Sequence, residues 1–322
     1  MKKRIFAVLI MAVLSMVFVG CGKSKDVVHI GVSQLLKHEA LDAAYDGFVD
    51  ALADAGYVDG ENIKIDHHNA QGDQSNTNTI ANKLVTDNND LILAIGTPAA
   101  QAAANATKDI PILISAITDP AKSGLVESNE LPNTNVSGAS DLTPVKKQIE
   151  LLNQLLPDAK SIAILYSSSE DNSKIQAALA QEAAKEYNIE TMEATVSNLN
   201  EIQQVIESLV GKVDAIYVPT DNDMASGMPT ISMIATQNNI PIITGEEGPV
   251  KNGGLATYGI DYYKLGRITG EQAVQIIEGK AEISKMPIAY LPEEECAFAF
   301  NEEVAKQLGI EIPSELKELM ED

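Results

Sequence analysis

Short apolar runs alternate along the chain with longer segments in which apolar residues recur every three or four positions. Residues 27–32 form a largely β-branched run, and residues 40–55 repeat apolar side chains at helical spacing before Gly56. This pattern predicts a strand followed by an amphipathic helix that ends at a glycine. The alternation continues to residue 115, with strands expected at 63–66, 91–95 and 110–115 and helices at 74–87 and 97–107.

The second half of the chain repeats this pattern, with strands expected at 161–166, 191–194, 215–219 and 240–244 and helices at 173–187 and 199–210. Residues 89–97 correspond in sequence to 213–221, and residues 109–115 to 239–245. Continuous apolar strands separated by helices predict a parallel sheet with helices on both faces. We therefore expect two similar, doubly wound, Rossmann-like α/β lobes. Their boundary falls near residues 140–144, and the polar loops after their strands should face one another across a cleft.

The first 20 residues have the form of a signal peptide, with a basic start, an apolar run over 5–19 and a small residue before Cys21. The four residues that end at Cys21 resemble a bacterial lipobox, in which the cysteine is acylated and becomes residue one after cleavage. We expect a lipid such as palmitate on Cys21, a tether over 21–26, and a protein held on the extracytoplasmic face of the cell membrane. An uncleaved anchor and an ordinary signal sequence remain the alternatives.

Charge restricts the possible partners. The chain has 23 Lys and Arg residues against 46 Asp and Glu, a formal net charge of -23, which repels nucleic acids and bare anionic bilayers. Its two arginines are Arg4 and Arg267. Because arginine is the usual bidentate partner of phosphate and carboxylate, this composition disfavours phosphorylated and dicarboxylate ligands and favours uncharged or zwitterionic ones. We expect Arg267 to pair with a carboxylate near its own helix.

The loops after the expected strands are rich in hydroxyl and carboxylate groups. A zwitterion needs donors for its carboxylate and acceptors for its ammonium, and these residue types supply both. The alternative for each residue is that it caps the helix that follows. We expect Asp221, which is equivalent in position to Thr97, to hold the ammonium, and we expect His38 to lie in a solvated loop. The candidate ligand-binding residues are Ser33, Gln34, Thr97, Ser115, Thr118, Asp119, Ser140, Asp141, Ser167, Glu170, Asn172, Ser173, Thr220, Asp221, Asn222 and Glu246.

Motifs for catalysis or metal binding find little support. Residues 221–223 begin like a calcium loop, but the sixth position is Ser226 and the twelfth is Ser232. His67 and His68 are adjacent, so on a strand they point to opposite faces. We therefore expect no catalytic residue, cofactor or metal.

Six segments together resemble one family, the tryptophan-type ABC-transporter substrate-binding lipoproteins, which are related in fold to type I periplasmic binding proteins. The resemblance covers residues 27–313. It rests on residues 40–48, 117–120, 136–141, 166–173, 219–222 and 258–266.

The resemblance implies two lobes joined by three crossings, with a ligand trapped between them and delivered to a membrane permease with a cytoplasmic ATPase. Lobe one would comprise residues 27–141 and 260–285, and lobe two residues 142–259 and 286–322. The implied ligand is an aromatic amino acid: tryptophan, phenylalanine or tyrosine. The alternatives are a receptor that presents its liganded form to a membrane signalling protein and, third, an extracytoplasmic enzyme.

Overall fold

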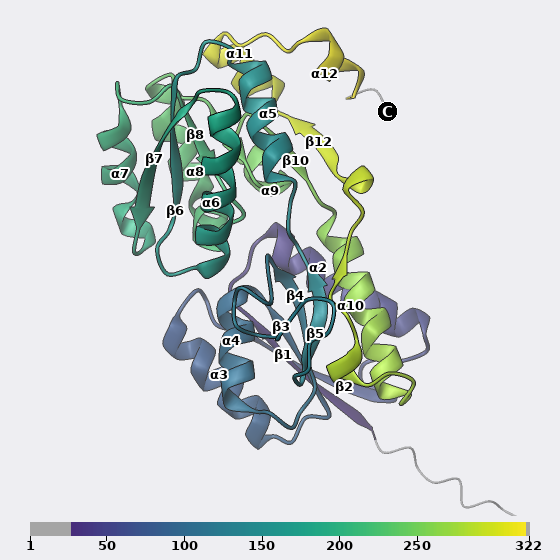
Figure 1. Cartoon of the computed structure of the whole chain (residues 1–322). Helices are drawn as coiled ribbons and strands as arrows, with labels where there is room; N and C mark the ends of the chain where they lie inside the picture. Colours follow the sequence, from purple (N-terminus) through teal and green to yellow (C-terminus); the bar gives the residue numbers. More distant parts are fainter. Residues whose placement is uncertain (1–26, 320–322) are drawn as a thin grey trace, which may run out of the picture.

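The chain forms two lobes in a computed structural model that describes residues 27–319 (Figure 1). The expected signal peptide, Cys21 and the tether lie outside the described residues. Within residues 27–319, no helix has both the length and the hydropathy needed to cross a membrane.

The first lobe is built on a parallel six-stranded sheet in the order β11-β5-β4-β3-β1-β2. Its strands are β1 (Val28–Gln34), β2 (Ile63–Asn69), β3 (Leu91–Ile95), β4 (Ile112–Ile117), β5 (Val136–Ser140) and β11 (Ala289–Tyr290). Helices α2 (Glu39–Asp54) and α10 (Tyr262–Ile277) cover one face, and α3 (Gln74–Thr86) and α4 (Thr97–Ala106) cover the other.

The second lobe repeats that sheet in the order β12-β10-β9-β8-β6-β7, with only β12 antiparallel. Its strands are β6 (Ser161–Ser167), β7 (Glu190–Val196), β8 (Ala215–Val218), β9 (Ile242–Thr244), β10 (Ala256–Gly259) and β12 (Ala297–Phe300). Its helices are α5 (Val145–Leu155), α6 (Asp171–Glu186), α7 (Ile202–Leu209), α8 (Asn222–Gln237), α9 (Glu247–Lys251), α11 (Glu302–Leu308) and α12 (Ser314–Glu318). The matched orders confirm the predicted fold class and the correspondence of β3 with β8 and of β4 with β9.

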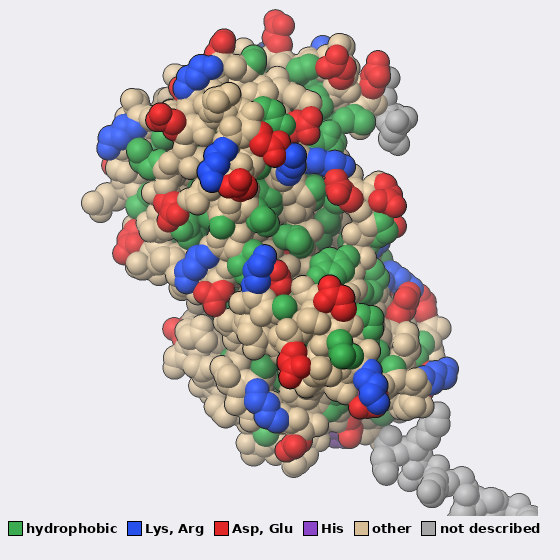
Figure 2. Space-filling model, viewed as in Figure 1, with side chains coloured by type: hydrophobic (Ala, Val, Ile, Leu, Met, Phe, Trp, Pro, Cys, Tyr) green, Lys and Arg blue, Asp and Glu red, His purple; other side chains and the backbone are tan. Residues whose placement is uncertain are grey.

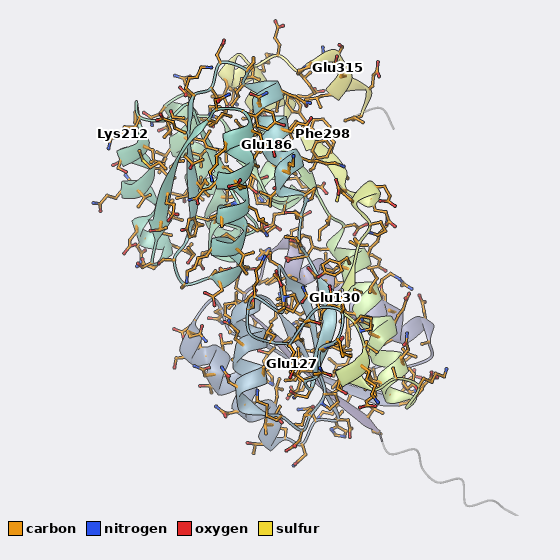
Figure 3. The ribbon with its side chains drawn as sticks, viewed as in Figure 1. Glu127, Glu130, Glu186, Lys212, Phe298 and Glu315 are labelled. Atoms are coloured by element: carbon orange, nitrogen blue, oxygen red, sulfur yellow. The ribbon has the colours of Figure 1, made fainter. Side chains whose placement is uncertain are left out.

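Both faces of each sheet are apolar, because helices cover both. On β3, Leu91 and Leu93 pack in the core under α2 and α10, whereas Ile92 and Ala94 pack under α3 and α4. At the far edge of lobe two, Phe298 lies 5.5 Å from Tyr258 between ring centroids (Figure 3). Acidic and basic side chains are interspersed over the face shown in Figure 2. Ion pairs between such exposed side chains contribute little to stability, because water and salt screen them.

Helices α2 and α10 touch through glycine. A Cβ added at Gly266 would meet the carbonyl oxygen of Ala44 at 2.0 Å, and one added at Gly47 would meet that of Tyr263 at the same distance. The helix backbones are therefore in direct contact, which ties α10 to the start of the chain although it comes late in the sequence.

The third crossing between the lobes lies later in the chain than expected. The predicted boundary, which ended lobe one at residue 285 and began lobe two at 286, therefore needs correction. The chain passes between lobes after β5, after β10 and after β11, and β11 pairs with β5 of lobe one through Ala289 and Ala139. Met286 also packs in the lobe-one core. Residues 286–290 therefore belong to the first lobe, and the chain returns to the second only before β12.

Candidate ligand site between the lobes

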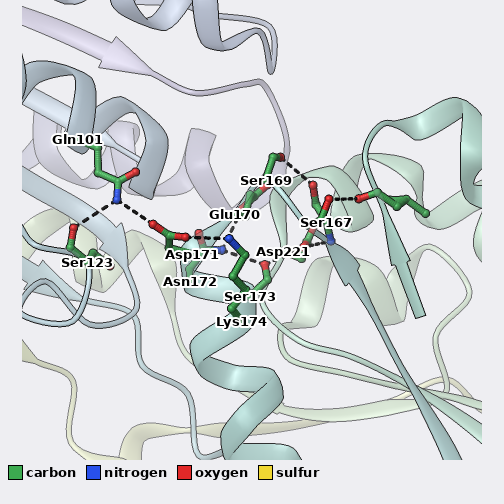
Figure 4. A network of polar contacts seen from close by, with 12 residues as sticks. Gln101, Ser123, Ser167, Ser169, Glu170, Asp171, Asn172, Ser173, Lys174 and Asp221 are labelled. Atoms are coloured by element: carbon green, nitrogen blue, oxygen red, sulfur yellow. Dashed lines mark hydrogen bonds and ion pairs between the residues drawn. The ribbon is translucent and has the colours of Figure 1, made fainter. Parts of the chain in front are cut away.

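The carboxyl ends of the strands point toward the junction of the lobes, as expected for open α/β sheets. Four side-chain contacts span the junction. Gln176 of α6 donates to Thr118 Oγ1 at 3.0 Å. At other points the contacts join His38 to Asn222 at 3.1 Å, Gln101 to Asp171 at 3.1 Å (Figure 4), and Lys251 to Glu39 at 2.6 Å. The lobes are thus closed onto one another.

Three hydroxyls of lobe one lie at this junction without a partner. Ser33 is the second-last residue of β1, Thr97 opens α4 shortly after β3, and Ser115 lies on β4; these residues are 0%, 1% and 0% exposed. None of the three hydroxyl oxygens has a hydrogen-bond partner among the described residues. Ser33 lies in register with Ala94 on the face covered by α3 and α4, whereas Ser115 lies in register with Ile95 on the face covered by α2 and α10. Since buried hydroxyls are normally satisfied, the unpartnered donors of Ser33 and Thr97 beside the N-terminus of α4 suit an anionic group such as a carboxylate.

A bulge next to Ser115 shapes this end of β4. Ala116 has a φ of 60°, and the register between β4 and β5 shifts between Ile114 and Ile117. A positive φ is unfavourable for a residue with a Cβ and is found where the surrounding structure imposes it. Beyond the bulge, Thr118 Oγ1 donates to Asp141 at 3.2 Å.

The second lobe contributes a satisfied polar network around Asp221 (Figure 4). One carboxylate oxygen of Asp221 accepts from the backbone N–H of Met224 at 2.8 Å. The other accepts from the backbone N–H of Ser167 and the hydroxyl of Ser173, both at 2.7 Å. Because both oxygens already hold the start of α8 and the loop after β6, the geometry favours the capping role of Asp221 over ammonium binding.

Glu170 organises the same loop. Its carboxylate accepts from the side-chain amides of Asn172 at 2.9 Å and Asn222 at 2.5 Å. Burial raises the pKa of Glu170 well above its usual value, and the nearby Asp221 charge raises it further. Asn172 leaves its Oδ1 without a partner although the residue is buried, which adds one acceptor to the junction.

Two further buried carboxyls lie at the junction: Asp141 at the crossing after β5, and Glu246 after β9 in lobe two. Burial raises the pKa of Asp141 to about 6, although Tyr262 and Thr118 donate to it at 3.1 and 3.2 Å. Burial raises the pKa of Glu246 to about 8, and the charges of Asp141, Asp221 and Glu39 add to that shift. Glu246 also lines a cavity of ≈ 280 Å³ together with Glu39 and Tyr262.

The remaining predicted residues are engaged within the protein. Gln34 donates to the carbonyl of Leu36 and to Asp42 within lobe one, at 2.9 and 2.8 Å. Asp119 accepts from Asn129 and from the backbone of Lys122. These two residues therefore stabilise loops. Ser140 binds the carbonyl of Thr118, Ser167 binds Asp223, and Thr220 binds Gln176.

Sequence reasoning missed three residues at the junction. Gln176 is fully buried one turn after Ser173, and this buried polar position on α6 was the available signal. Tyr262 opens α10 and donates to Asp141. The expectation of a solvated His38 is wrong, because the residue is partly buried at the junction, where its ring contacts Asn222. Burial lowers the pKa of His38, although the contact with Asn222 acts in the opposite direction.

Metal-ligating residues do not cluster in residues 27–319: no group of three or more His, Cys, Asp or Glu is placed to hold an ion. Arg267 pairs with Asp54 at 2.7 Å, as its helix position predicted. The junction is thus lined by hydroxyls, amides and carboxyls.

Known proteins place the chain among solute-binding proteins. Residues 29–321 match the family described as ABC transporter substrate binding protein. The tyrosine-binding protein of Clostridioides difficile (strain R20291) is 50% identical over 288 residues, which cover 89% of this chain and 83% of that protein.

Two solved structures bear on the arrangement of the lobes. The ABC domain from Streptococcus pneumonia in complex with L-Trp superposes with a TM-score of 0.87 at 40% identity and covers 90% of this chain and 97% of that one. The second is the ligand-free, open structure of a substrate binding protein with adhesive properties from Clostridium difficile. It is 51% identical, and the match covers 89% of this chain and 97% of that one, yet its TM-score is only 0.69. Since the more identical chain superposes less well, the lobes here stand as in the L-Trp complex rather than as in the open structure. From the match over residues 29–321, the 50% identity and this shared two-lobed architecture, it follows that the chain belongs to the ABC transporter substrate-binding proteins.

Proposed function

We propose that this protein captures a free aromatic L-amino acid, tyrosine or tryptophan, and delivers it to an ABC importer. The observation that carries the proposal is the pair of unpartnered hydroxyls of Ser33 and Thr97 at the closed junction. They offer donors for one carboxylate at the N-terminus of α4.

Charge supports a zwitterion with a single carboxylate. Arg267 is the only arginine among the described residues, and it is held by Asp54 on the surface, away from the junction. Hydroxyl and backbone donors can satisfy one carboxylate without an arginine, whereas a phosphate or a second carboxylate would bring charge that this site does not balance. The aromatic ring is supported by two relatives, one named a tyrosine-binding protein and the other solved with L-Trp.

Ligand fluorescence tests the proposal directly. The chain contains no tryptophan, so indole emission reports on added L-tryptophan alone. Transfer into the closed junction should shift that emission to the blue and raise its anisotropy, and unlabelled L-tyrosine should displace it. Unchanged emission at saturating protein, together with no heat on titration of tyrosine or phenylalanine, would exclude aromatic amino acids.

Substitution of a single hydroxyl tests how the ligand is held. Thr97→Val keeps the shape of the side chain and should weaken binding about fivefold to tenfold, the effect of one lost hydrogen bond. Ser137→Ala is the matched control, because Ser137 is equally buried but donates to the carbonyl of Met286 at 2.7 Å, at the β11 edge of the sheet. Equal losses in the two variants would indicate a general effect on stability instead.

Anchoring by lipid is the second part of the proposal, and its support is the lipobox-like sequence before Cys21. Cys21→Ser should block acylation and leave an unlabelled precursor after growth with radiolabelled palmitate. The chain has only one other cysteine, so Cys296→Ser should keep the label. Label retained in Cys21→Ser would contradict the proposal. Stable attachment needs two or more acyl chains, because a single chain binds a bilayer only weakly.

A further inference from the structure

We infer that Gln148 is a positioning residue, whose side-chain amide couples the loop after β9 at the junction to the second crossing between the lobes, after β10. It acts through two backbone carbonyls rather than through contact with the ligand. Its effect on ligand capture rests on the proposed function, whereas its effect on backbone motion is a property of the ligand-free protein.

The amide of Gln148 is buried and all of its hydrogen-bonding atoms have partners. The residue is 0% exposed and lies in the first turn of α5, directly after the first crossing. Its Nε2 donates to the carbonyl of Gly245 at 3.1 Å and to that of Tyr258 at 2.7 Å. Its Oε1 accepts from the hydroxyl of Tyr217 at 2.6 Å. Because a carbonyl can only accept, the nitrogen must face the two carbonyls, and the orientation of the amide is fixed.

The two carbonyls lie where neighbouring strands separate. β9 and β10 pair through Ile243 and Ala256. Two residues later along each strand come Gly245 and Tyr258, and from there β9 leads to α9 at the junction, whereas β10 leads across to α10 of lobe one. Gln148 therefore bridges the strands at their point of divergence. A shift of the second crossing on lobe closure is transmitted through this one amide to the loop that lines the junction.

The loop after β9 has little freedom on its other side. The backbone N–H of Gly245 donates to the carbonyl of Val218 at 2.7 Å. A Cβ added at Gly245 would meet the backbone nitrogen of Thr220 at 2.4 Å. The loop is thus held between the end of β8 and the amide of Gln148, so loss of the amide would release one of its two supports.

Packing alone does not require an amide at this position. Val145, Ile149 and Leu152, the neighbours of Gln148 on α5, are buried in the apolar core of lobe two. A buried amide is costly unless its hydrogen bonds are made, and an apolar side chain of the same length would fill the space. What the amide adds is a fixed geometry between three backbone and side-chain partners from β8, β9 and β10.

Hydrogen exchange on the ligand-free protein tests the coupling. Gln148→Met keeps the length of the side chain and removes its three hydrogen bonds. Amide exchange measured by mass spectrometry should rise at least about tenfold in peptides that cover residues 245–247 and 258–260, and much less in β6, because a local support has been lost. If Gln148→Met does not fold, Tyr217→Phe provides the same test with a smaller effect, since it removes the donor that orients the amide.

Gln272→Met is the matched control. Gln272 is 8% exposed on α10 and donates to the carbonyl of Gly138 at 3.3 Å within lobe one. The two Gln→Met variants should both have a lowered Tm, but Gln272→Met should leave exchange at 245–247 and 258–260 unchanged.

Ligand affinity provides the second readout. By calorimetry, Gln148→Met should bind L-tyrosine about 5- to 20-fold more weakly, because the ligand must then order the loop that the amide otherwise holds. Gln272→Met should stay within about twofold of the unsubstituted protein. Tyr217→Phe should weaken binding by about two- to fivefold, and it should add nothing further in the Gln148→Met background, because the two residues act through one amide.

The outcomes separate this inference from the proposed function. Exchange that rises equally throughout lobe two in Gln148→Met, or losses that add fully in the double variant, would reduce Gln148 to a packing role. A mobile loop with unchanged L-tyrosine affinity would overturn its part in ligand capture. If the unsubstituted protein binds no aromatic amino acid, the proposed function fails, and the exchange pattern alone decides whether Gln148 couples the loop to the crossing.

Discussion

Ligand affinity should rise steeply with pH between 6 and 8, because the ammonium of the proposed amino-acid ligand would favour the ionised form of Glu246, a buried carboxyl at the junction to which no described residue donates. Burial raises the pKa of this carboxyl to about 8 in the ligand-free protein. About 1% of it is therefore ionised at pH 6 and half at pH 8, and a ligand that needs the ionised form gains about 50-fold in affinity, or about 2.3 kcal/mol. Asp141, with a pKa raised to about 6, adds a shallower dependence below pH 6.

The groups around Glu246 determine the sign of this effect. Asp141 follows β5, Asp221 follows β8, and Glu39 begins α2, and all three charges raise the pKa of Glu246. Tyr262 of α10 donates to Asp141, and the cation of Lys251 is held by Glu39 and Glu247. No protein cation therefore offsets the cluster, and the arriving ammonium lowers the pKa of Glu246 and displaces its proton.

Calorimetry in two buffers of different ionisation enthalpy measures this proton directly. At pH 7 close to one proton should leave for each ligand bound, and Glu246→Gln should abolish both the release and the pH dependence above pH 6. Stability shows the opposite trend. A raised pKa in the folded state means that the ligand-free protein loses stability as pH rises from about 4.5 to 8, so the ligand-induced increase in Tm should grow over that range. Affinity that is flat from pH 6 to 8, with no proton released, would refute this reasoning.

Three substitutions test other parts of the structure. Asp221→Ala leaves three buried donors unpaired and should lower the free energy of unfolding by about 2 to 4 kcal/mol; Asp221→Asn should cost about 1 to 2 kcal/mol, and an Asn variant as stable as the original in urea unfolding would contradict the observed bonding. Gly266→Ala places a methyl against the carbonyl of Ala44 and should cost at least about 2 kcal/mol, measured as a lowered Tm; an unchanged Tm would show that α2 and α10 separate freely. Gln176→Ala removes the bond to Thr118 across the junction and should weaken ligand binding about fivefold to 30-fold by calorimetry, whereas unchanged affinity would remove Gln176 from the closed state.

The repeating apolar strands made the fold predictable, whereas small and mixed residues hid other elements. β5 has the sequence Val-Ser-Gly-Ala-Ser, whose small side chains carry little apolar signal. Its burial comes from tertiary contact, since a Cβ at Gly138 would meet the carbonyl oxygen of Ile114 at 2.1 Å. α8 contains Pro229, which argues against a helix in isolation.

The meeting of the polar strand ends at the junction was predictable from the sequence, but the hydrogen bonds that each residue makes were not. Strand ends rich in Ser, Thr and Asp indicate where a ligand binds, because the topology brings them together. Whether Asp221 caps a helix or Glu246 remains unpaired depends on distances that sequence spacing does not encode. Gln34 illustrates this limit, because its partner Asp42 lies one helix turn into α2 and uses the amide that a ligand would need.

Helix α10 is synthesised long after α2, the helix it packs against, and this order affects how the chain can fold during translation. α2 leaves the ribosome about 200 residues before the helix that covers its apolar face around Phe48. The first sheet gains its last strand only with β11, and the second only with β12 at Ala297–Phe300. Neither lobe can therefore complete its core until translation is nearly finished, so the nascent chain stays open and exposes apolar surface that a chaperone can hold. Such a chain is still in a form that can be threaded through a secretion channel, and it acquires its compact shape only after the last crossing has been synthesised.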